Sequence, residues 1–322
     1  MAGSSRLRQL VKSALTRVGA PFEARFGPPG RIRAHRSRLE ALPSIPESIR
    51  RFDARWPADV EPPDDTPIFI LSAGWRSGST MLQRLVLSSG RVLIWGEPYD
   101  HCDVIRRLAE SLRAFDAEYP PDDFLLSSHA EDEDLSGEWV ANLYPHPHAV
   151  RAAHRAQLAA LFAEPAREAG YAQWGVKEVR LGIEHAAYLK WLYPSSRFLL
   201  LYRDPYAAYR SFRRFRGWYD RYPDEPVLTA RQFGAVWRRL TEGFVRDFEQ
   251  VGGCLVSFEE LTREPATVSR LSDYLGLTLN PDALSRRIAG RGDVRPQPVP
   301  RAELRLLKKE VEPLASRLGY TS

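Results

Sequence analysis

Ile68-Phe-Ile-Leu-Ser-Ala-Gly-Trp-Arg-Ser-Gly-Ser-Thr-Met-Leu82 is the stretch of this chain that decides its fold. An apolar run ends at Gly74, a loop of small and hydroxyl residues follows, and a helical pattern then extends to a stop at Gly90. Where a strand, a tight loop and a helix start follow one another, backbone N–H groups and the helix dipole converge on an anion. The stretch therefore predicts a phosphate or sulfate site, although many strand–turn–helix corners rich in Gly and Ser bind nothing.

The loop differs from the Walker A motif of nucleoside triphosphatases. That motif reads GxxxxGK[ST], where the Lys reaches the terminal phosphates and the Ser or Thr holds magnesium. Here Gly74 and Gly78 are one residue closer together, and Ser79 stands in the place of the Lys. The positive charge lies inside the loop instead, at Arg76. An ordinary triphosphate site is therefore disfavoured.

Beyond this loop, short apolar runs alternate with helical patterns. The apolar runs suit strands buried on both faces of a parallel sheet, and they are residues 92–95, 173–176, 197–202 and 254–258. The helical patterns between and after them cover residues 149–169, 205–216, 229–251 and 266–275. This alternation predicts an α/β fold with ligands at the carboxyl ends of the strands.

Charged residues follow the ends of four predicted strands. They are Arg76, Glu97, Lys177 and Arg203. Each alone is unremarkable in position, because charged residues commonly mark the point where a strand meets water. Three cations around one carboxylate, beside an anion loop, predict a site at one edge of the sheet.

The order of these motifs resembles that of the PAPS-dependent sulfotransferases. Trp75-Arg-Ser-Gly-Ser-Thr80 resembles the family's 5′-phosphosulfate loop, and Arg203-Asp-Pro-Tyr-Ala-Ala-Tyr-Arg-Ser211 resembles its 3′-phosphate segment. Phe258-Glu-Glu-Leu, before a helix that stops at Gly276, resembles the family's Tyr-Glu-Asp-Leu segment with Phe in place of Tyr. The resemblance covers residues 66–280 and leaves both ends unexplained.

This resemblance implies a P-loop-type three-layer sandwich, with a central parallel sheet flanked by helices. It implies PAPS (3′-phosphoadenosine 5′-phosphosulfate) as the sulfo donor, without a metal, and sulfo transfer to an acceptor hydroxyl. By the same resemblance, the catalytic residues are Glu97, Arg76 and Lys177. The implied cofactor-binding residues are Arg76, Ser77, Gly78, Ser79, Thr80, Met81, Arg203 and Ser211.

The identity of the catalytic base depends on the branch of the family. The Arg-Ser-Gly-Ser-Thr loop and Gly96-Glu97-Pro98 are similar to trehalose sulfotransferase and, more loosely, to the tyrosylprotein sulfotransferases, in which the matching Glu serves as the base. The cytosolic small-molecule branch uses a His instead, and His101 is therefore the rival here. We favour Glu97, because it lies at the predicted strand end itself. The branch also favours a carbohydrate or glycolipid acceptor.

The charge of the chain is concentrated at its N-terminus. Residues 1–60 contain 12 Lys and Arg against 5 Asp and Glu, whereas the remainder is slightly acidic. Residues 5–19 form an amphipathic basic pattern that could lie on an anionic membrane surface, although such helices more often dock on their own domain. We expect a basic helical extension over residues 1–60 and a sulfotransferase domain over 61–322. The Pro-rich, acidic residues 61–67 mark the boundary between them.

Composition excludes several other classes of protein. No apolar stretch approaches the roughly 18 residues of a membrane helix, and the N-terminus lacks a signal-peptide pattern. The two cysteines give neither a disulfide framework nor metal-ligand spacing, which predicts a reducing, cytoplasmic location, with peripheral membrane attachment as an open addition. No reader motif for nucleic acid accompanies the basic segment. Residues 116–138, with nine acidic residues and no Lys or Arg, predict a solvated insertion.

Two other functions stay open from sequence. One is a P-loop kinase-like phosphotransferase, which the missing Walker Lys disfavours. The other is a catalytically inactive membrane or protein adaptor that keeps the fold. The acceptor and the oligomeric state are not encoded in any motif of the chain.

Overall fold

The structure is a computed structural model that describes residues 42–57, 65–97, 103–129, 134–137, 140–213, 226–286 and 298–321. The chain divides into two compact units, Met1–Ser44 and Ile45–Ser322. Of the first unit, residues 42–44 are described, so the predicted basic helix at residues 5–19 lies outside the described residues. The fold below is that of the second unit.

The described residues form a five-stranded parallel sheet with the order β2-β3-β1-β4-β5. Its strands are β1 (Ile68–Ser72), β2 (Val92–Gly96), β3 (Gln173–Glu178), β4 (Arg197–Tyr202) and β5 (Cys254–Ser257). β1 is central, and all five of its residues are buried, as its uninterrupted apolar sequence requires. The predicted α/β fold with a parallel sheet is confirmed.

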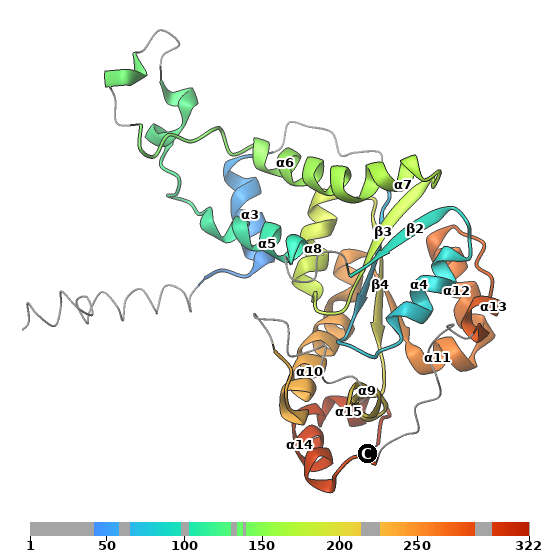
Figure 1. Cartoon of the computed structure of the whole chain (residues 1–322). Coiled ribbons are helices and arrows are strands. Elements are labelled where there is room, and N and C mark those ends of the chain that lie inside the picture. The colour runs from blue at the N-terminus through green and yellow to red at the C-terminus, as the bar shows by residue number, and fades with distance from the viewer. Residues whose placement is uncertain are drawn as a thin grey trace, which may run out of the picture. The chain divides into compact units, whose positions relative to one another are not determined.

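One face of the sheet, to which Ile68 and Ile70 of β1 point, is covered by helices. These helices are α4 (Ser79–Leu87), α11 (Phe258–Arg263), α12 (Pro265–Leu275) and α13 (Asp282–Ser285). Leu82, Leu85 and Val86 of α4 are buried in this layer. In Figure 1 these helices lie together on the right of the sheet.

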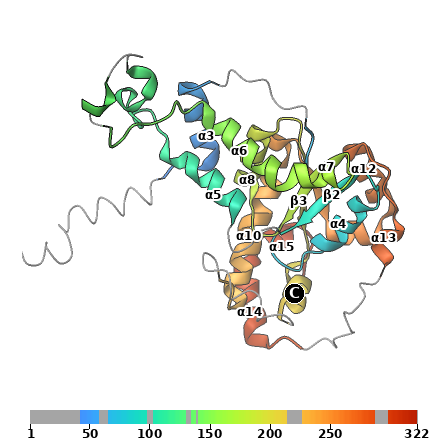
Figure 2. The same ribbon diagram turned by 45° about the horizontal axis from the view of Figure 1, so that its top comes forward.

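The alternate residues of β1, Phe69 and Leu71, face a larger cluster on the other side of the sheet. The helices that contribute to it include α3 (Ile45–Arg55), α5 (Val104–Ser111), α6 (Ala149–Leu158), α8 (Ile183–Leu192), α9 (Pro205–Phe212), α10 (Ala230–Asp247), α14 (Arg301–Val311) and α15 (Leu314–Arg317). Figure 2 shows the sheet between α4 and α12 on one side and α8 and α10 on the other, which confirms the three-layer sandwich.

α3 belongs to this core. Its Ile45 and Phe52 are buried, as is Trp56 just after it. Asp53 accepts a hydrogen bond from the indole Nε1 of Trp191 at 2.9 Å. From sequence we expected these residues in the N-terminal extension, whereas in the structure they belong to the same compact unit as the sheet. The apolar stripe of α3 explains this difference, because it needs the core for its burial.

The connections carry the remaining elements. The predicted helix at 149–169 is α6, a π-helical segment at Ala159–Ala163 and α7 (Glu164–Glu168). The acidic segment at 116–138 shows short 3₁₀ turns at Asp122–Phe124, Leu126–Ser128 and Leu135–Gly137, and most of its described residues are exposed or half-buried. In the described part of the chain, no helix has the length and apolar character that a membrane span needs.

Candidate active site

The loop after β1 has an unusual backbone. Gly74, Arg76 and Gly78 have φ angles of +81°, +66° and +93°, all in the left-handed region. Ala73 N donates to Leu201 O of β4 at 2.8 Å, which anchors the loop to the sheet. The Ser77 hydroxyl is buried and donates to the Gly74 carbonyl. The chain thereby enters α4, whose first turn has no side-chain cap.

That first turn of α4 supplies the backbone groups for an anion. Gly78 is the N-cap, and α4 starts at the buried Ser79, with Thr80 exposed and Met81 half-buried. The first N–H groups of a helix have no intrahelical acceptor, and the helix dipole is positive there. The structure thus gives residues 77–81 the geometry that the sequence predicts for an anion loop.

Gly78 also allows a close approach of the loop to α11. A Cβ at this position would lie 2.2 Å from the Cδ2 of Phe258, so no larger residue fits there without displacement of the ring. The same ring packs under the guanidinium of Arg203, whose Cζ is 4.1 Å from the ring centroid. Phe258 therefore links the anion loop to the segment that follows β4.

Arg203 is held against the loop. Its NH1 donates to the Arg76 carbonyl at 3.0 Å, and its own carbonyl accepts from Trp237 Nε1 at 2.9 Å. Burial lowers the pKa of Arg203, while Glu259 and Asp204 oppose that change. Within the described residues, its buried Nε has no hydrogen-bond partner. A half-buried cation whose buried Nε is an unused donor favours an anionic ligand.

Ser211 lies two turns into α9 and contacts the loop. Its hydroxyl accepts a hydrogen bond from Arg76 Nε at 2.9 Å. Asp204 caps α9, because its Oδ1 accepts from Tyr206 N at 2.8 Å. Arg76, Arg203 and Ser211 thus form one group, which we call the arginine cluster, at the ends of the adjacent strands β1 and β4.

Glu97 and Lys177 form a second group at the same edge of the sheet. They lie at the ends of the neighbouring strands β2 and β3, where Gly96 is in register with Lys177. Their side chains form an ion pair, and Glu97 N also donates to Lys177 O at 2.8 Å. The Lys177 side chain is 5% exposed and that of Glu97 is 25% exposed, so the carboxylate is the member that a ligand can reach.

Glu97 also has a strained backbone. Its φ of +43° lies in the left-handed region, which costs a non-glycine residue about 1–2 kcal/mol. Such residues persist where the surrounding structure holds them, and they cluster at functional sites. The rival base His101 lies outside the described residues.

A model of the sulfotransferase family, described as "Sulfotransferase family", matches residues 67–281. This chain belongs to the sulfotransferase family. No curated protein sequence is significantly similar to it. The match includes both the arginine cluster and the Glu97–Lys177 pair.

Three solved sulfotransferases resemble the chain in fold. The sulfotransferase domain of the Synechococcus PCC 7002 olefin synthase is 21% identical, with a TM-score of 0.43, over 81% of this chain and 98% of that domain. The sulfotransferase domain from the curacin biosynthetic pathway is 19% identical, with a TM-score of 0.44, over 80% of this chain and 98% of that domain. Sulfotransferase STF9 from Mycobacterium avium is 14% identical, with a TM-score of 0.40, over 85% of this chain and 82% of STF9.

The predicted site residues of this family member make two sets of contacts in the structure. From sequence we expected three cations around one carboxylate; in the structure Lys177 pairs with Glu97, and Arg76 donates to Ser211. The pairing depends on strand order, because β1 and β4 are neighbours, as are β2 and β3. Strand order cannot be deduced from the spacing of the motifs.

Two supporting residues were missed from sequence. Glu259 accepts from Asp204 N at 3.2 Å and from the Tyr320 hydroxyl at 2.8 Å, so it ties α9 to the C-terminal segment. Trp237 of α10 fixes the Arg203 carbonyl. Glu259 lies in the motif that resembles Tyr-Glu-Asp-Leu and could have been proposed from it, but nothing near Tyr320 in the sequence marks it.

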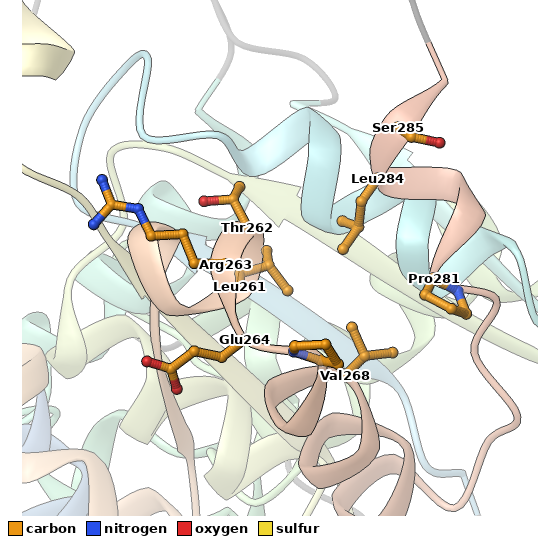
Figure 3. Close-up of a pocket in the computed structure, with 9 residues that line it drawn as sticks. Leu261, Thr262, Arg263, Glu264, Val268, Pro281, Leu284 and Ser285 are labelled. Carbon is orange, nitrogen blue, oxygen red and sulfur yellow. The ribbon is translucent and has the colours of Figure 1, made fainter.

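A small hollow near this region contains none of the predicted site residues. It lies among α11, α12 and α13, and Leu261, Val268 and Leu284 line it (Figure 3). Among the described residues, no three His, Cys, Asp or Glu side chains come close enough together to hold a metal ion.

Proposed function

We propose that this chain transfers a sulfo group from PAPS to a hydroxyl of an acceptor, with Glu97 as the general base. The observation that carries the proposal is the contact of the arginine cluster with the anion loop, at the sheet edge that also presents Glu97. Two anion-binding elements fit a donor with two separate anionic groups, as PAPS has.

The residues present fit such a donor. The backbone of residues 77–81 and the start of α4 would hold the 5′-phosphosulfate. Arg203, with its unused buried Nε, would hold the 3′-phosphate together with Ser211. The contact of Arg76 with Ser211 favours a phosphate-binding role for Arg76 in addition to the catalytic role implied by resemblance.

When bound, PAPS supplies an activated sulfo group, with PAP as the leaving group. An alcohol is a poor nucleophile near neutral pH, and its attack requires a base within about 3 Å of the hydroxyl. Glu97 is accessible and would take that proton at its carboxylate. Lys177 is buried beside it, orients the carboxylate through their ion pair, and adds a fixed positive charge at the reaction centre.

The proposed acceptor class rests on the resemblance: the loop and the Gly96-Glu97 sequence favour a carbohydrate or glycolipid. The proposed reaction needs no metal and involves no nucleic acid. Attachment of the basic N-terminal segment to a membrane surface and a cytoplasmic location stay predictions.

Calorimetric titration tests the cofactor directly. We expect PAP to bind more tightly than ADP or ATP, without magnesium, and we expect a panel of glycan, glycolipid and phenolic acceptors to include one that gains the mass of a sulfo group. Tight binding of ATP with magnesium but not of PAP would identify a kinase-like phosphotransferase. Absence of any nucleotide binding would favour an adaptor.

A further inference from the structure

A larger hollow lies among α5, the start of α8 and α10. Its volume is about 920 Å³, which is at the upper end of the range for small-molecule sites. Arg106 and Arg113 line it from the side of α5, His185 from α8, and Val236 and Arg239 from α10. None of these residues belongs to the arginine cluster or to the Glu97–Lys177 pair.

The hollow borders the anion loop and is linked to the chain that leaves β3. Val236 packs beside the anion loop, since a Cβ on Gly74 would lie 3.9 Å from its Cγ1. Arg106 NH2 donates to the carbonyl of Arg180 at 3.4 Å, and Arg180 is three residues after Lys177 on the chain that leaves β3. A molecule in the hollow would therefore lie beside the anion loop, on the side that Val236 covers.

The lining has a surplus of positive charge. Five arginines and three glutamates line the hollow. Of the described residues in the lining, His185 is the one with an aromatic ring. Arg113 and Glu184 form a loose pair at 3.6 Å, with both side chains partly exposed. Such a pair is weakly stabilising and can exchange its partner for a ligand anion at little cost.

His185 adds a hydrogen-bond donor. Burial, together with Arg106, Arg239 and Arg113, lowers the pKa of His185 to about 3, so its ring is neutral at pH 7. Its Nδ1 accepts a hydrogen bond from Gly182 N at 3.3 Å, which leaves the proton on Nε2. That Nε2 is buried and has no partner in the described part of the chain. It is available to an oxygen of a ligand.

We propose that this hollow is the acceptor site and that the acceptor is an anionic carbohydrate, a sugar that carries a carboxylate or phosphate group. The inference rests on the proposed function, because it assumes that a sulfo donor occupies the anion loop. The guanidinium groups can bind the acidic group, and the glutamates can accept hydrogen bonds from sugar hydroxyls. Among the described residues, the lining has no Phe, Tyr or Trp to pack against a phenol ring.

Binding of three probes to the chain with and without saturating PAP tests the proposal. The probes are methyl glucoside, methyl glucuronide and glucose 6-phosphate, each titrated by calorimetry into the wild type, Arg113→Gln and Arg239→Gln. Arg167→Gln is the matched control, because Arg167 is an exposed residue of α7 (Glu164–Glu168) that does not line the hollow. We expect at least one acidic probe to bind roughly tenfold or more tightly than the glucoside, and each of the two lining variants to remove that preference.

The preferred acidic probe then distinguishes a carboxylate from a phosphate. Equal binding of glucoside and acidic probes, no binding of any probe, or an unchanged preference in both lining variants would overturn the proposal. Its failure is separate from that of the proposed function, because PAP affinity is measured in the same series. The control variant should match the wild type in every titration.

Discussion

At the scale of single residues, Arg203 is the position on which the cofactor assignment depends most. Its guanidinium lies against the Phe258 ring, donates to the Arg76 carbonyl and keeps an unused donor at its buried Nε. We expect Arg203→Ala to weaken PAP binding by roughly 10- to 100-fold, because a charge-assisted contact with phosphate is lost. Arg210→Ala, at an exposed position of α9, the helix that follows Arg203, should leave the calorimetric Kd unchanged. Similar losses in both variants would show that only the general positive charge of this segment matters.

Gly78 tests the close approach of the loop to Phe258. We expect Gly78→Ala to lower the free energy of unfolding by about 1–2 kcal/mol for its left-handed φ, and by a further ~1–3 kcal/mol for overpacking against the ring. Gly90→Ala is the matched control, since Gly90 has a φ of +69° with nothing within 4 Å of its Cβ position. Urea unfolding of both variants measures the difference. Equal losses would mean that Phe258 moves aside freely.

At the scale of elements, α6 and α8 share a buried polar contact that responds to pH. The Tyr188 hydroxyl lies 2.9 Å from His154 Nδ1, and burial lowers the pKa of His154 from 6.5 to about 4. The unfolded chain takes up this proton near pH 6.5 and the folded chain only near pH 4. The contribution of His154 to stability is therefore complete above pH 6.5 and is lost as the pH falls towards and through 4.

The difference between the two pKa values predicts that the free energy of unfolding falls by at most about 3 kcal/mol between pH 6.5 and pH 4. His154→Asn keeps an acceptor for Tyr188 but does not titrate, so it should flatten that part of the profile. His148→Asn, at an exposed position, should retain the wild-type slope. A profile with the same slope for His154→Asn and the wild type would assign the pH dependence to other groups.

The elements differ in how far the sequence predicts them. The strands were predictable because each contains a short apolar run, which in β1 is buried throughout. The loop was predictable because its glycines allow the left-handed φ angles with which the chain turns into α4. The contact of Arg76 with Ser211 spans 135 residues and depends on β4 lying beside β1, which no local pattern encodes. The same holds for Tyr320 with Glu259.

At the scale of the whole molecule, α3 changes the expectation for truncation. From sequence, residues 1–60 were expected to form an extension outside the sulfotransferase domain, so their removal would leave cofactor binding intact. Ile45, Phe52 and Trp56 are buried, however, and burial of each large apolar side chain stabilises a fold by about 1.5–3 kcal/mol. We now expect deletion of residues 1–60 to lower the melting temperature markedly and to weaken PAP binding through partial unfolding.

Deletion of residues 1–41 is the matched control, because it leaves every described residue in place. This variant should melt like the full chain and should bind PAP with the same Kd. An unchanged melting temperature after deletion of residues 1–60 would contradict the role of α3 in the core. Flotation of full-length and 1–41-deleted protein with anionic liposomes at low salt, where electrostatic attachment is strongest, tests the membrane prediction.

The central claim for the whole molecule is that the anion loop, the arginine cluster and the Glu97–Lys177 pair form one active site with Glu97 as base. Glu97→Gln tests it most directly, because Gln keeps the shape and can still accept a hydrogen bond from Lys177, but it cannot take a proton. We predict that Glu97→Gln binds PAP like the wild type and loses roughly 10²-fold or more of its sulfo-transfer rate, while His101→Ala is milder. Normal transfer by Glu97→Gln, together with an inactive His101→Ala, would contradict the account and make His101 the base.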